Sequence, residues 1–276
     1  MRKIDYDIWS FLSGWREIQN TKVSVVRKDR GQLVRTFAEL VERVAQLSFR
    51  NPEFVLFYRG QPQDFPNRTG ASSLYPGIFR SHASYLKQDE VERRFQRLLR
   101  AEDLLSEQYD LEGARRIRIH QILRWAILQH YEVCATPLLD VTQSLRVACA
   151  FAQLQTKTGA LIYVLGLPQI SGSVTASSEH GIQIIRLLSI CPPSALRPHF
   201  QEGFLVGEYP TISFKTKAEY DRNEFDFGQR LLCKFRLGRK ASFWTKDFPM
   251  ISKRALYPDA RMDRLHRLAQ SISVQL

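Results

Sequence analysis

The sequence lacks the paired cysteines that mark disulfide-rich or zinc-binding proteins. Its four cysteines, Cys134, Cys149, Cys191 and Cys233, are far apart and form no Cys-x-x-Cys pair. Metal-ligand spacing is therefore absent, and we expect buried thiols in a reducing cytosol. The cysteine pattern predicts neither a disulfide framework nor a bound metal.

Long apolar runs are missing as well. Asp5, Asp7 and Ser10 interrupt the first fifteen residues, so we expect no secretory signal there. No stretch reaches the roughly 18 consecutive apolar residues that a membrane-spanning helix needs. The expectation is a cytoplasmic protein without a membrane partner.

Familiar catalytic motifs are also absent. The chain contains no Walker phosphate loop, no Gly-x-Gly-x-x-Gly after a strand, no His-Glu-x-x-His and no Gly-x-Ser-x-Gly. At the level of sequence, these absences exclude the common nucleotide-binding loops, the zinc proteases and the serine hydrolases. Function must be sought in less common combinations of residues.

Composition and charge indicate a folded protein with an uneven surface. The 276 residues are 44% hydrophobic and 25% charged, which is ordinary for a globular domain. The net charge is +12, and residues 229–267 hold eleven Lys or Arg against three acids. This segment would attract nucleic acid, acidic partners or phosphate-bearing ligands, unless it is only a solvated face that aids solubility.

Hydrophobic periodicity predicts a mixture of helices and strands. Helices are expected at 33–48, 84–109, 117–130, 144–156 and 262–274. Strands are expected at 23–28, 54–59, 138–143, 159–167, 181–189 and 231–237, the last with alternating inside and outside positions, with a loop at 62–78 and a hairpin at 204–214. Because helices gather early and strands late, the order favours an α+β fold over a doubly wound sheet.

The first combination of interest is Tyr58-Arg59-Gly60-Gln61, at the end of an expected strand. A half-buried arginine must be paired, because desolvation of its charge is costly. A phosphate or carboxylate would match its planar guanidinium, so Arg59 either contacts a ligand anion or pairs internally with an acid such as Asp140. We expect Gly60 to form a turn that lets a ligand approach.

The second combination runs from His130-Tyr131, at a helix end, to Asp140-Val141-Thr142. Alternation along a strand places Asp140 and Thr142 on the same side. These two side chains would line a site or, alternatively, cap the helix that follows. His130 is either part of that site or structural.

The third combination is the polar run from Arg197 through Gln201 and Glu202 to Gly203, directly before an expected strand. The glycine permits close approach of backbone or ligand. A plain polar turn is the alternative interpretation.

In this order the three combinations resemble the FRG domain family, over about residues 23–265. The family's Phe-Arg-Gly signature reads Tyr58-Arg59-Gly60 here. The other matching positions are His130, Tyr131, Thr136, Leu138, Leu139, Asp140, Thr142, Ala148, Phe151, Ala152, Arg197, Gln201, Gly203, Phe204 and Leu256-Tyr257-Pro258-Asp259. The chain departs from the family at 132–136, where Gly-Leu-Pro-Thr-Arg is usual, and at Val141, where tryptophan is usual.

A looser similarity connects the same order of blocks to ADP-ribosyltransferases of the arginine, Ser-Thr-Ser, glutamate type. It implies an α+β domain over 23–265 with a helical insertion and a central split β-sheet, flanked by an N-terminal arm or helix (1–22) and a C-terminal helix end (266–276). The implied activity is NAD-dependent ADP-ribosyl transfer or NAD cleavage, in a toxin or antiphage effector, with NAD as substrate.

The transferase similarity also implies roles for particular residues. Arg59 would hold the pyrophosphate, and a carboxylate would stabilise the oxocarbenium-like ribose. Glu202 is the nearest carboxylate to the expected position, which Gly203 occupies. The catalytic candidates are Arg59, Glu202 and Asp140; the ligand-binding candidates are Gly60, Gln61, His130, Tyr131, Thr142 and Gln201; no metal is expected.

Two other functions stay open at this point. A non-catalytic nucleotide or ligand sensor on the same fold is favoured by Gly203. A nucleic-acid-binding module would use the basic segment 229–267. The partners expected are therefore a nucleotide ligand, a protein or nucleic-acid acceptor, and polyanions at the basic C-terminal third.

Overall fold

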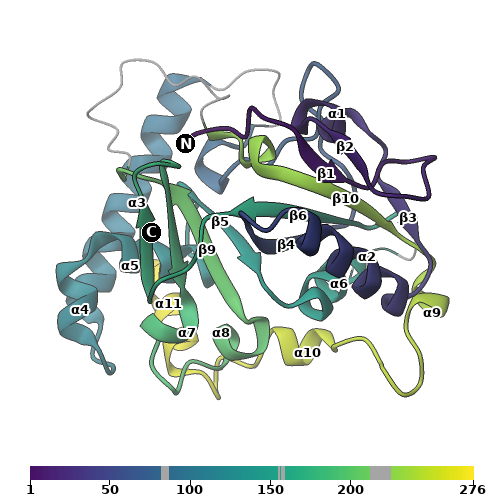
Figure 1. Ribbon diagram of the computed structural model, residues 1–276. Coiled ribbons are helices and arrows are strands. Elements are labelled where there is room, and N and C mark those ends of the chain that lie inside the picture. Colours follow the sequence, from purple (N-terminus) through teal and green to yellow (C-terminus); the bar gives the residue numbers. More distant parts are fainter. Residues whose placement is uncertain (82–86, 155, 157–158, 212–224) are drawn as a thin grey trace.

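The central feature of the protein is an eight-stranded mixed sheet with the strand order β3-β10-β6-β4-β5-β9-β8-β7 (Figure 1). The coordinates are a computed structural model that describes all residues except 82–86, 155, 157–158 and 212–224. The pairing of β3 with β10 is parallel, and the other neighbours in the sheet are antiparallel. The predicted α+β class, with a central sheet and an early helical insertion, is confirmed.

The strands of this sheet are β3 (Gln32–Val34), β4 (Val55–Gln61), β5 (Leu138–Thr142), β6 (Leu161–Leu167), β7 (Val174–Ser177), β8 (Ile182–Arg186), β9 (Gly203–Glu208) and β10 (Leu231–Leu237). A separate two-stranded sheet consists of β1 (Ile8–Ser10) and β2 (Gln19–Thr21). The longer helices are α2 (Phe37–Arg50), α3 (Gln88–Gln108), α5 (Gln121–His130), α6 (Leu145–Gln153) and α11 (Arg264–Gln275). The short ones are α1 (Val23–Lys28), α4 (Ala114–Ile119), α7 (Leu187–Ile190), α8 (Leu196–Gln201), α9 (Lys240–Phe243) and α10 (Lys253–Leu256).

The sheet is continuous, but it has a narrow seam between β4 and β5. These two strands share one paired position, Tyr58 with Thr142. By contrast, β4 pairs with β6 along its whole length, and β5 does so with β9. The polar residues next to the seam are therefore not all covered by a neighbouring strand.

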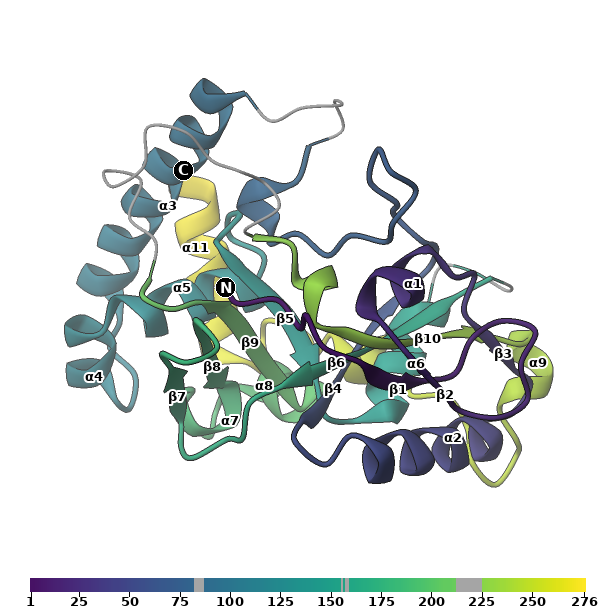
Figure 2. The same ribbon diagram turned by 45° about the horizontal axis from the view of Figure 1, so that its top comes forward.

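Helices cover the two faces of the sheet and create two hydrophobic cores. Figures 1 and 2 show α3, α5 and α11 gathered at one side of the molecule and α2 and α6 at the other. Along β9, Phe204 and Val206 belong to the core that includes α2 and α6, while Leu205 belongs to the core that includes α3, α5 and α11. This alternation is the period of two that a strand imposes on its side chains.

The prediction of a strand at 23–28 is wrong, because these residues form α1. Val23 and Val26, three positions apart, both enter the core from one face of this helix. Arg27, in its last turn, is buried and forms an ion pair with Asp226. Tertiary contacts therefore outweigh the preference of the valines for a strand.

Two predicted helices have different bounds in the structure. The segment 33–48 begins as strand β3, and α2 starts after Thr36, whose side chain accepts a hydrogen bond from the Glu39 amide at 3.1 Å. The segment 117–130 is interrupted at His120, which separates α4 from α5. Local capping thus sets one boundary that hydrophobic periodicity alone does not reveal.

Three predicted strands also need correction. The segment 181–189 changes from β8 to helix α7 at Leu187. The segment 231–237 is buried on both sides at every position except Arg236, instead of alternating. In the predicted hairpin at 204–214, β9 pairs with β5 and β8, and positions 212–214 lie outside the described residues.

Both ends of the chain pack against the sheet or its helices. Residues 1–22, predicted as an arm or helix, contribute β1 and β2, and Ile8 and Phe11 lie in the core. Helix α11 joins the other core through Leu265, Ala269 and Ile272. Within the described residues, no helix is long and apolar enough to cross a membrane.

Candidate functional site

A cavity of about 260 Å³ lies at the seam between β4 and β5. Its walls come from these two strands, the ends of α5 and α8, the start of β9, helix α6 and the residue after α10. The site residues predicted from sequence that line it are Arg59, Gly60, His130, Asp140, Thr142 and Gln201. The structure therefore brings together residues that lie up to 142 positions apart in the sequence.

Arg59 is a half-buried cation with unused hydrogen-bonding capacity. It lies within β4, which continues to Gln61, so it does not end the strand as predicted. Its Nη1 donates to the backbone oxygen of Asp140 at 2.6 Å, whereas its buried Nε has no partner in the described part of the chain. Burial and the nearby charge of Arg80 lower the pKa of Arg59 and Asp140 opposes them, with a net result of about 10, so the side chain stays charged at pH 7.

Asp140 supplies a carboxylate at the cavity. Its side chain is 40% exposed, and its Oδ2 accepts a hydrogen bond from Gln129 Nε2 at 2.8 Å. Burial alone raises the pKa of Asp140, but His130, Arg59 and Gln129 lower it by more, so the pKa lies below its usual range. The alternative of an Arg59–Asp140 ion pair holds only in part, because the hydrogen bond goes to the backbone oxygen.

His130 completes this side of the cavity as a buried, neutral ring. Its Nδ1 lies 3.8 Å from Asp140 Oδ1, and its buried Nε2 has no partner within the described residues. Burial lowers the pKa of His130, and the nearby Asp140 carboxylate only partly opposes this effect. The imidazole is therefore uncharged at pH 7.

Gly203 is required by the side chains beside it. A Cβ atom at this position would lie 2.7 Å from Leu187 Cδ1 and 3.2 Å from His130 Cε1. No larger side chain fits while these two residues keep their positions. This packing gives a physical reason for the glycine where the transferase pattern has its glutamate.

Gly60 does not form the predicted turn, because it lies inside β4. A Cβ atom there would lie 1.9 Å from the backbone oxygen of Ala148 and 2.9 Å from the backbone nitrogen of Ala152. The glycine therefore allows α6 to pack directly on the strand. The Tyr-Arg-Gly block and the alanines of the next block form one packing unit.

Thr142 and Gln201 line the cavity and also hold its walls together. The Thr142 hydroxyl lies 3.2 Å from the Gln201 backbone oxygen and 3.0 Å from that of Glu202, both acceptors. It also accepts the backbone N–H of Ser144, the N-cap residue of α6, at 3.1 Å. This bond closes a turn before the helix and is not the predicted helix cap. Gln201 Nε2 donates to the Leu256 backbone oxygen at 2.8 Å, which attaches α10 to the site.

Three predicted site residues do not line the cavity: Gln61, Tyr131 and Glu202. Gln61 is buried, and Glu202 is exposed in a left-handed backbone conformation with φ of 45°. The Tyr131 hydroxyl donates to Asp263 at 3.0 Å, and Asp263 also caps α11. The functional roles given to these three residues from sequence stay predictions.

Several residues that line the cavity had no predicted role in the site: Tyr58, Gln129, Glu132, Phe151, Arg197 and Tyr257. Arg197 and Tyr257 belong to the blocks that resemble FRG domains, and this resemblance was the sequence signal that could have identified them. No sequence signal pointed to Glu132, since it falls where the chain departs from the family.

Two cations of the basic segment 229–267 do not lie on the protein surface. Arg230 and Lys234 are buried, where Arg230 Nε donates to the Gly166 backbone oxygen at 2.9 Å. The exposed cations of the segment are Arg239, Lys246, Lys253, Arg254, Arg261, Arg264 and Arg267. Part of the charge that suggested nucleic-acid binding is thus inside the protein.

The described residues contain no group of three or more His, Cys, Asp or Glu side chains placed to hold a metal ion. The four cysteines are free thiols. Burial raises the pKa of Cys134 to about 12 and raises that of Cys149 well above its usual range. These thiols are protonated and unreactive at pH 7.

Comparison with protein families supports part of the resemblance seen in the motifs. Comparison with curated proteins and with solved structures gave no match. Residues 55–160 match the family model of the FRG domain. This region contains Arg59, His130, Asp140 and Thr142, so the match covers the β4–β5 side of the cavity, and this part of the chain is similar to FRG domains.

Proposed function

We propose that the cavity binds NAD and that the protein breaks the nicotinamide–ribose bond, transferring ADP-ribose to water or to an acceptor. The observation that carries this proposal is the partly exposed, ionised Asp140 beside the half-buried, incompletely bonded Arg59 in one cavity. The proposal includes an ADP-ribosyltransferase-like arrangement of the strands on the two sides of the β4–β5 seam. The FRG match is compatible with it and names no reaction.

Binding would use the positive charge and the aromatic wall of the cavity. The planar guanidinium of Arg59 suits a pyrophosphate oxygen. Phe151 and Tyr257, whose rings meet edge to face at 5.9 Å, line the cavity and would contact a flat ring. A volume of about 260 Å³ is small for a whole dinucleotide, so we place the nicotinamide-ribose end inside.

In the reaction, the bond between ribose C1′ and the nicotinamide nitrogen breaks, and both electrons leave with nicotinamide, which becomes neutral. The positive charge that develops on the ribose is stabilised by the Asp140 carboxylate. Water or an acceptor hydroxyl then attacks C1′ and releases one proton to solvent. Neutral His130 adds no repulsive charge to this step.

The test is release of nicotinamide from NAD, measured by chromatography. Asp140→Asn keeps the shape of the side chain and removes its charge, so we expect the rate to fall by roughly 10²- to 10³-fold. Asp103→Asn, at an exposed position of α3, is the matched control and should release nicotinamide at the wild-type rate. Release by wild type no faster than by Asp140→Asn would reject the proposal.

A second candidate function is a sensor that binds the same ligand without cleaving it. It is favoured by the packing of Leu187 and His130 beside Gly203 and by the exposed position of Glu202. Binding of NAD measured by calorimetry, together with no nicotinamide release, would select this function. A role as toxin or antiphage effector follows only from cleavage, because cleavage depletes cellular NAD.

A further inference from the structure

Arg197 is a buried cation that also lines the cavity. Its side chain, on α8, is 6% exposed. The guanidinium carbon lies 4.7 Å from the ring centre of Tyr257 and 5.7 Å from that of Tyr131. These cation–π contacts, with the hydrogen bond from the Arg197 amide to Asp263 at 3.1 Å, hold the residue in place.

The hydrogen bonding of Arg197 is incomplete in the same way as that of Arg59. Its buried Nε has no partner in the described residues. Its Nη2 donates to Glu132 Oε1 at 2.6 Å, and the Glu132 side chain is 65% exposed. The anion that neutralises this buried cation thus comes from the solvent side of the cavity.

Glu132 is weakly attached to this position. It follows the end of α5 in a left-handed conformation with φ of 59°, which is unfavourable for a residue with a side chain. An ion pair with one exposed partner contributes little, because water competes for the carboxylate. A ligand anion could therefore replace Glu132 on Arg197 at small cost.

The two arginines lie on different walls of one cavity. Arg59 reaches it from β4 and Arg197 from α8. Tyr257, beside Arg197, lines the cavity together with Asp140 and Phe151. One ligand that fills the cavity would thus meet the guanidinium groups of both arginines.

We infer that Arg197 is a second anion-binding group of the pocket, that Glu132 occupies it in the absence of ligand, and that the pocket takes a nucleotide with at least two phosphates. One phosphate lies at Arg59 and another displaces Glu132 from Arg197. The inference rests on the anion contact at Arg59 in the proposed function, but it requires no bond cleavage.

Calorimetric binding of ADP and AMP tests the inference. Wild type should bind ADP more tightly than AMP. Glu132→Gln removes the competing carboxylate and should tighten ADP binding by roughly two- to fivefold. Arg197→Gln should weaken ADP binding by at least about tenfold and change AMP binding by less than about twofold, since only ADP reaches Arg197.

Two further variants serve as controls for this test. Glu107→Gln, at an exposed position of α3, is the matched control for Glu132→Gln and should leave both affinities unchanged. Arg197→Lys keeps the charge, and its loss of ADP affinity should be intermediate. This variant replaces Arg197→Gln if thermal unfolding shows that the glutamine variant is not folded.

The inference fails if wild type does not bind ADP, or if the Arg197 variant weakens AMP and ADP equally. It also fails if Glu132→Gln leaves ADP affinity unchanged, since the ion pair would then be only structural. The proposed function is rejected by a separate result, which is the absence of nicotinamide release from NAD. Preference for ADP over AMP without NAD cleavage would support the inference and reject catalysis. NAD cleavage without that preference would support catalysis and reject the inference.

Discussion

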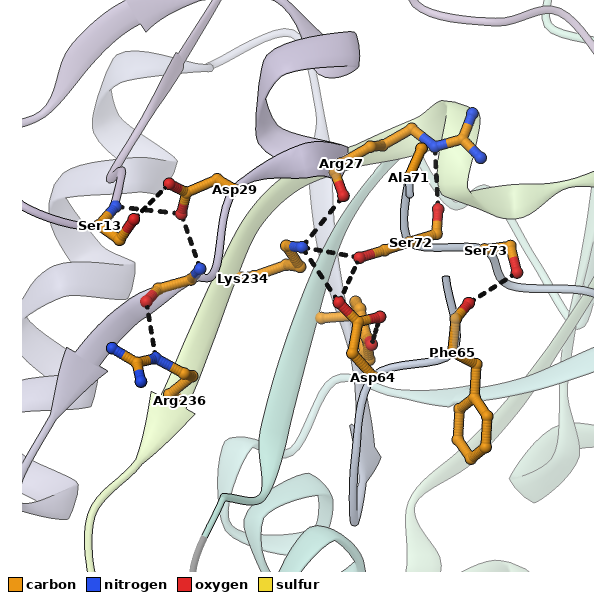
Figure 3. A network of polar contacts seen from close by, with 12 residues as sticks. Ser13, Arg27, Asp29, Asp64, Phe65, Ala71, Ser72, Ser73, Lys234 and Arg236 are labelled. Carbon is orange, nitrogen blue, oxygen red and sulfur yellow. Dashed lines mark hydrogen bonds and ion pairs between the residues drawn. The ribbon is translucent and has the colours of Figure 1, made fainter. Parts of the chain in front are cut away.

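Two polar clusters in this protein differ in how completely their groups are paired. The first, which we call the closed cluster, consists of Asp64, Ser72 and Lys234, which Figure 3 shows, together with Tyr163. Lys234 is 1% exposed, and its Nζ donates to Ser72 Oγ at 2.7 Å, to Asp64 Oδ2 at 3.3 Å and to the Arg27 backbone oxygen at 3.1 Å. The Tyr163 hydroxyl donates to Asp64 Oδ1 at 2.6 Å.

The second cluster is the pocket, where pairing is incomplete. Buried nitrogens of Arg59, His130 and Arg197 have no partner within the described residues. Buried polar groups are nearly always hydrogen-bonded, and these three exceptions belong to residues that line the cavity. The closed cluster has its ammonium fully paired and connects the loop after β4 to β10. Buried charge is thus fully paired in the closed cluster and only partly paired beside the cavity.

The largest effect on stability should come from breaking the closed cluster. Asp64→Ala leaves the buried Lys234 without its carboxylate and Tyr163 without its acceptor, so we expect the free energy of unfolding to fall by about 3 kcal/mol or more. Asp140→Ala, in the pocket, should cost only about 1 kcal/mol, because Arg59 donates to the backbone oxygen of residue 140, which the variant keeps. Urea unfolding measures both, and equal losses would contradict the distinction between the clusters.

A smaller loss should follow from disturbing the wall of the pocket. Gly60→Ala places a Cβ atom 1.9 Å from the backbone oxygen of Ala148, so α6 must move away from β4. We expect a loss of about 2–3 kcal/mol in unfolding free energy. Gly172→Ala is the control, since its Cβ would meet nothing nearer than 3.9 Å and its effect should stay below about 0.5 kcal/mol. Similar losses in both variants would show that the contact with α6 is not tight.

The smallest expected effect is a pH dependence that separates the two clusters. The folded-state pKa of His130 is lowered, so below about pH 6.5 the unfolded chain binds a proton that the folded protein resists, and stability falls as pH falls. For Asp64, burial raises the pKa but hydrogen bonds from Tyr163 and Ser72 lower it by more, so its contribution is present above about pH 4 and is lost only below that.

Unfolding free energy measured between pH 7 and pH 5 therefore reports on the pocket more than on the closed cluster. In this range the wild type should lose at most about 1.4 kcal/mol per pH unit through His130, and His130→Gln should show a flatter profile. Identical slopes for the two proteins would mean that His130 is not held neutral.

The sequence predicted helices and strands with a clear hydrophobic pattern better than elements that depend on distant contacts. The periodic apolar residues of α3 and the continuous apolar run of β6 were sufficient to predict these elements, because each pattern lies within one segment. The valines of α1 were misleading, since its packing and the ion pair of Arg27 involve residues far along the chain.

The candidate site was also only partly predictable, because some of its contacts join segments that are far apart in the sequence. Arg59, His130 and Asp140 were found from their residue types and order, and the structure places them around one cavity. Arg197 received no role, because a charged residue in a polar run gives no sign of burial. Glu132 received none, because it falls where the chain departs from the family. Only the fold shows that Arg197 lies against Tyr257 and that Glu132 is its partner.

The sequence by itself determined the α+β class, the helical insertion and a set of polar residues next to expected strands, because these follow from local periodicity and side-chain chemistry. The tertiary structure alone decided which cations are buried, with Arg197, Arg230 and Lys234 inside and Arg239 outside. It also decided that Gly60 and Gly203 serve packing, because that depends on the neighbours that distant segments bring to them.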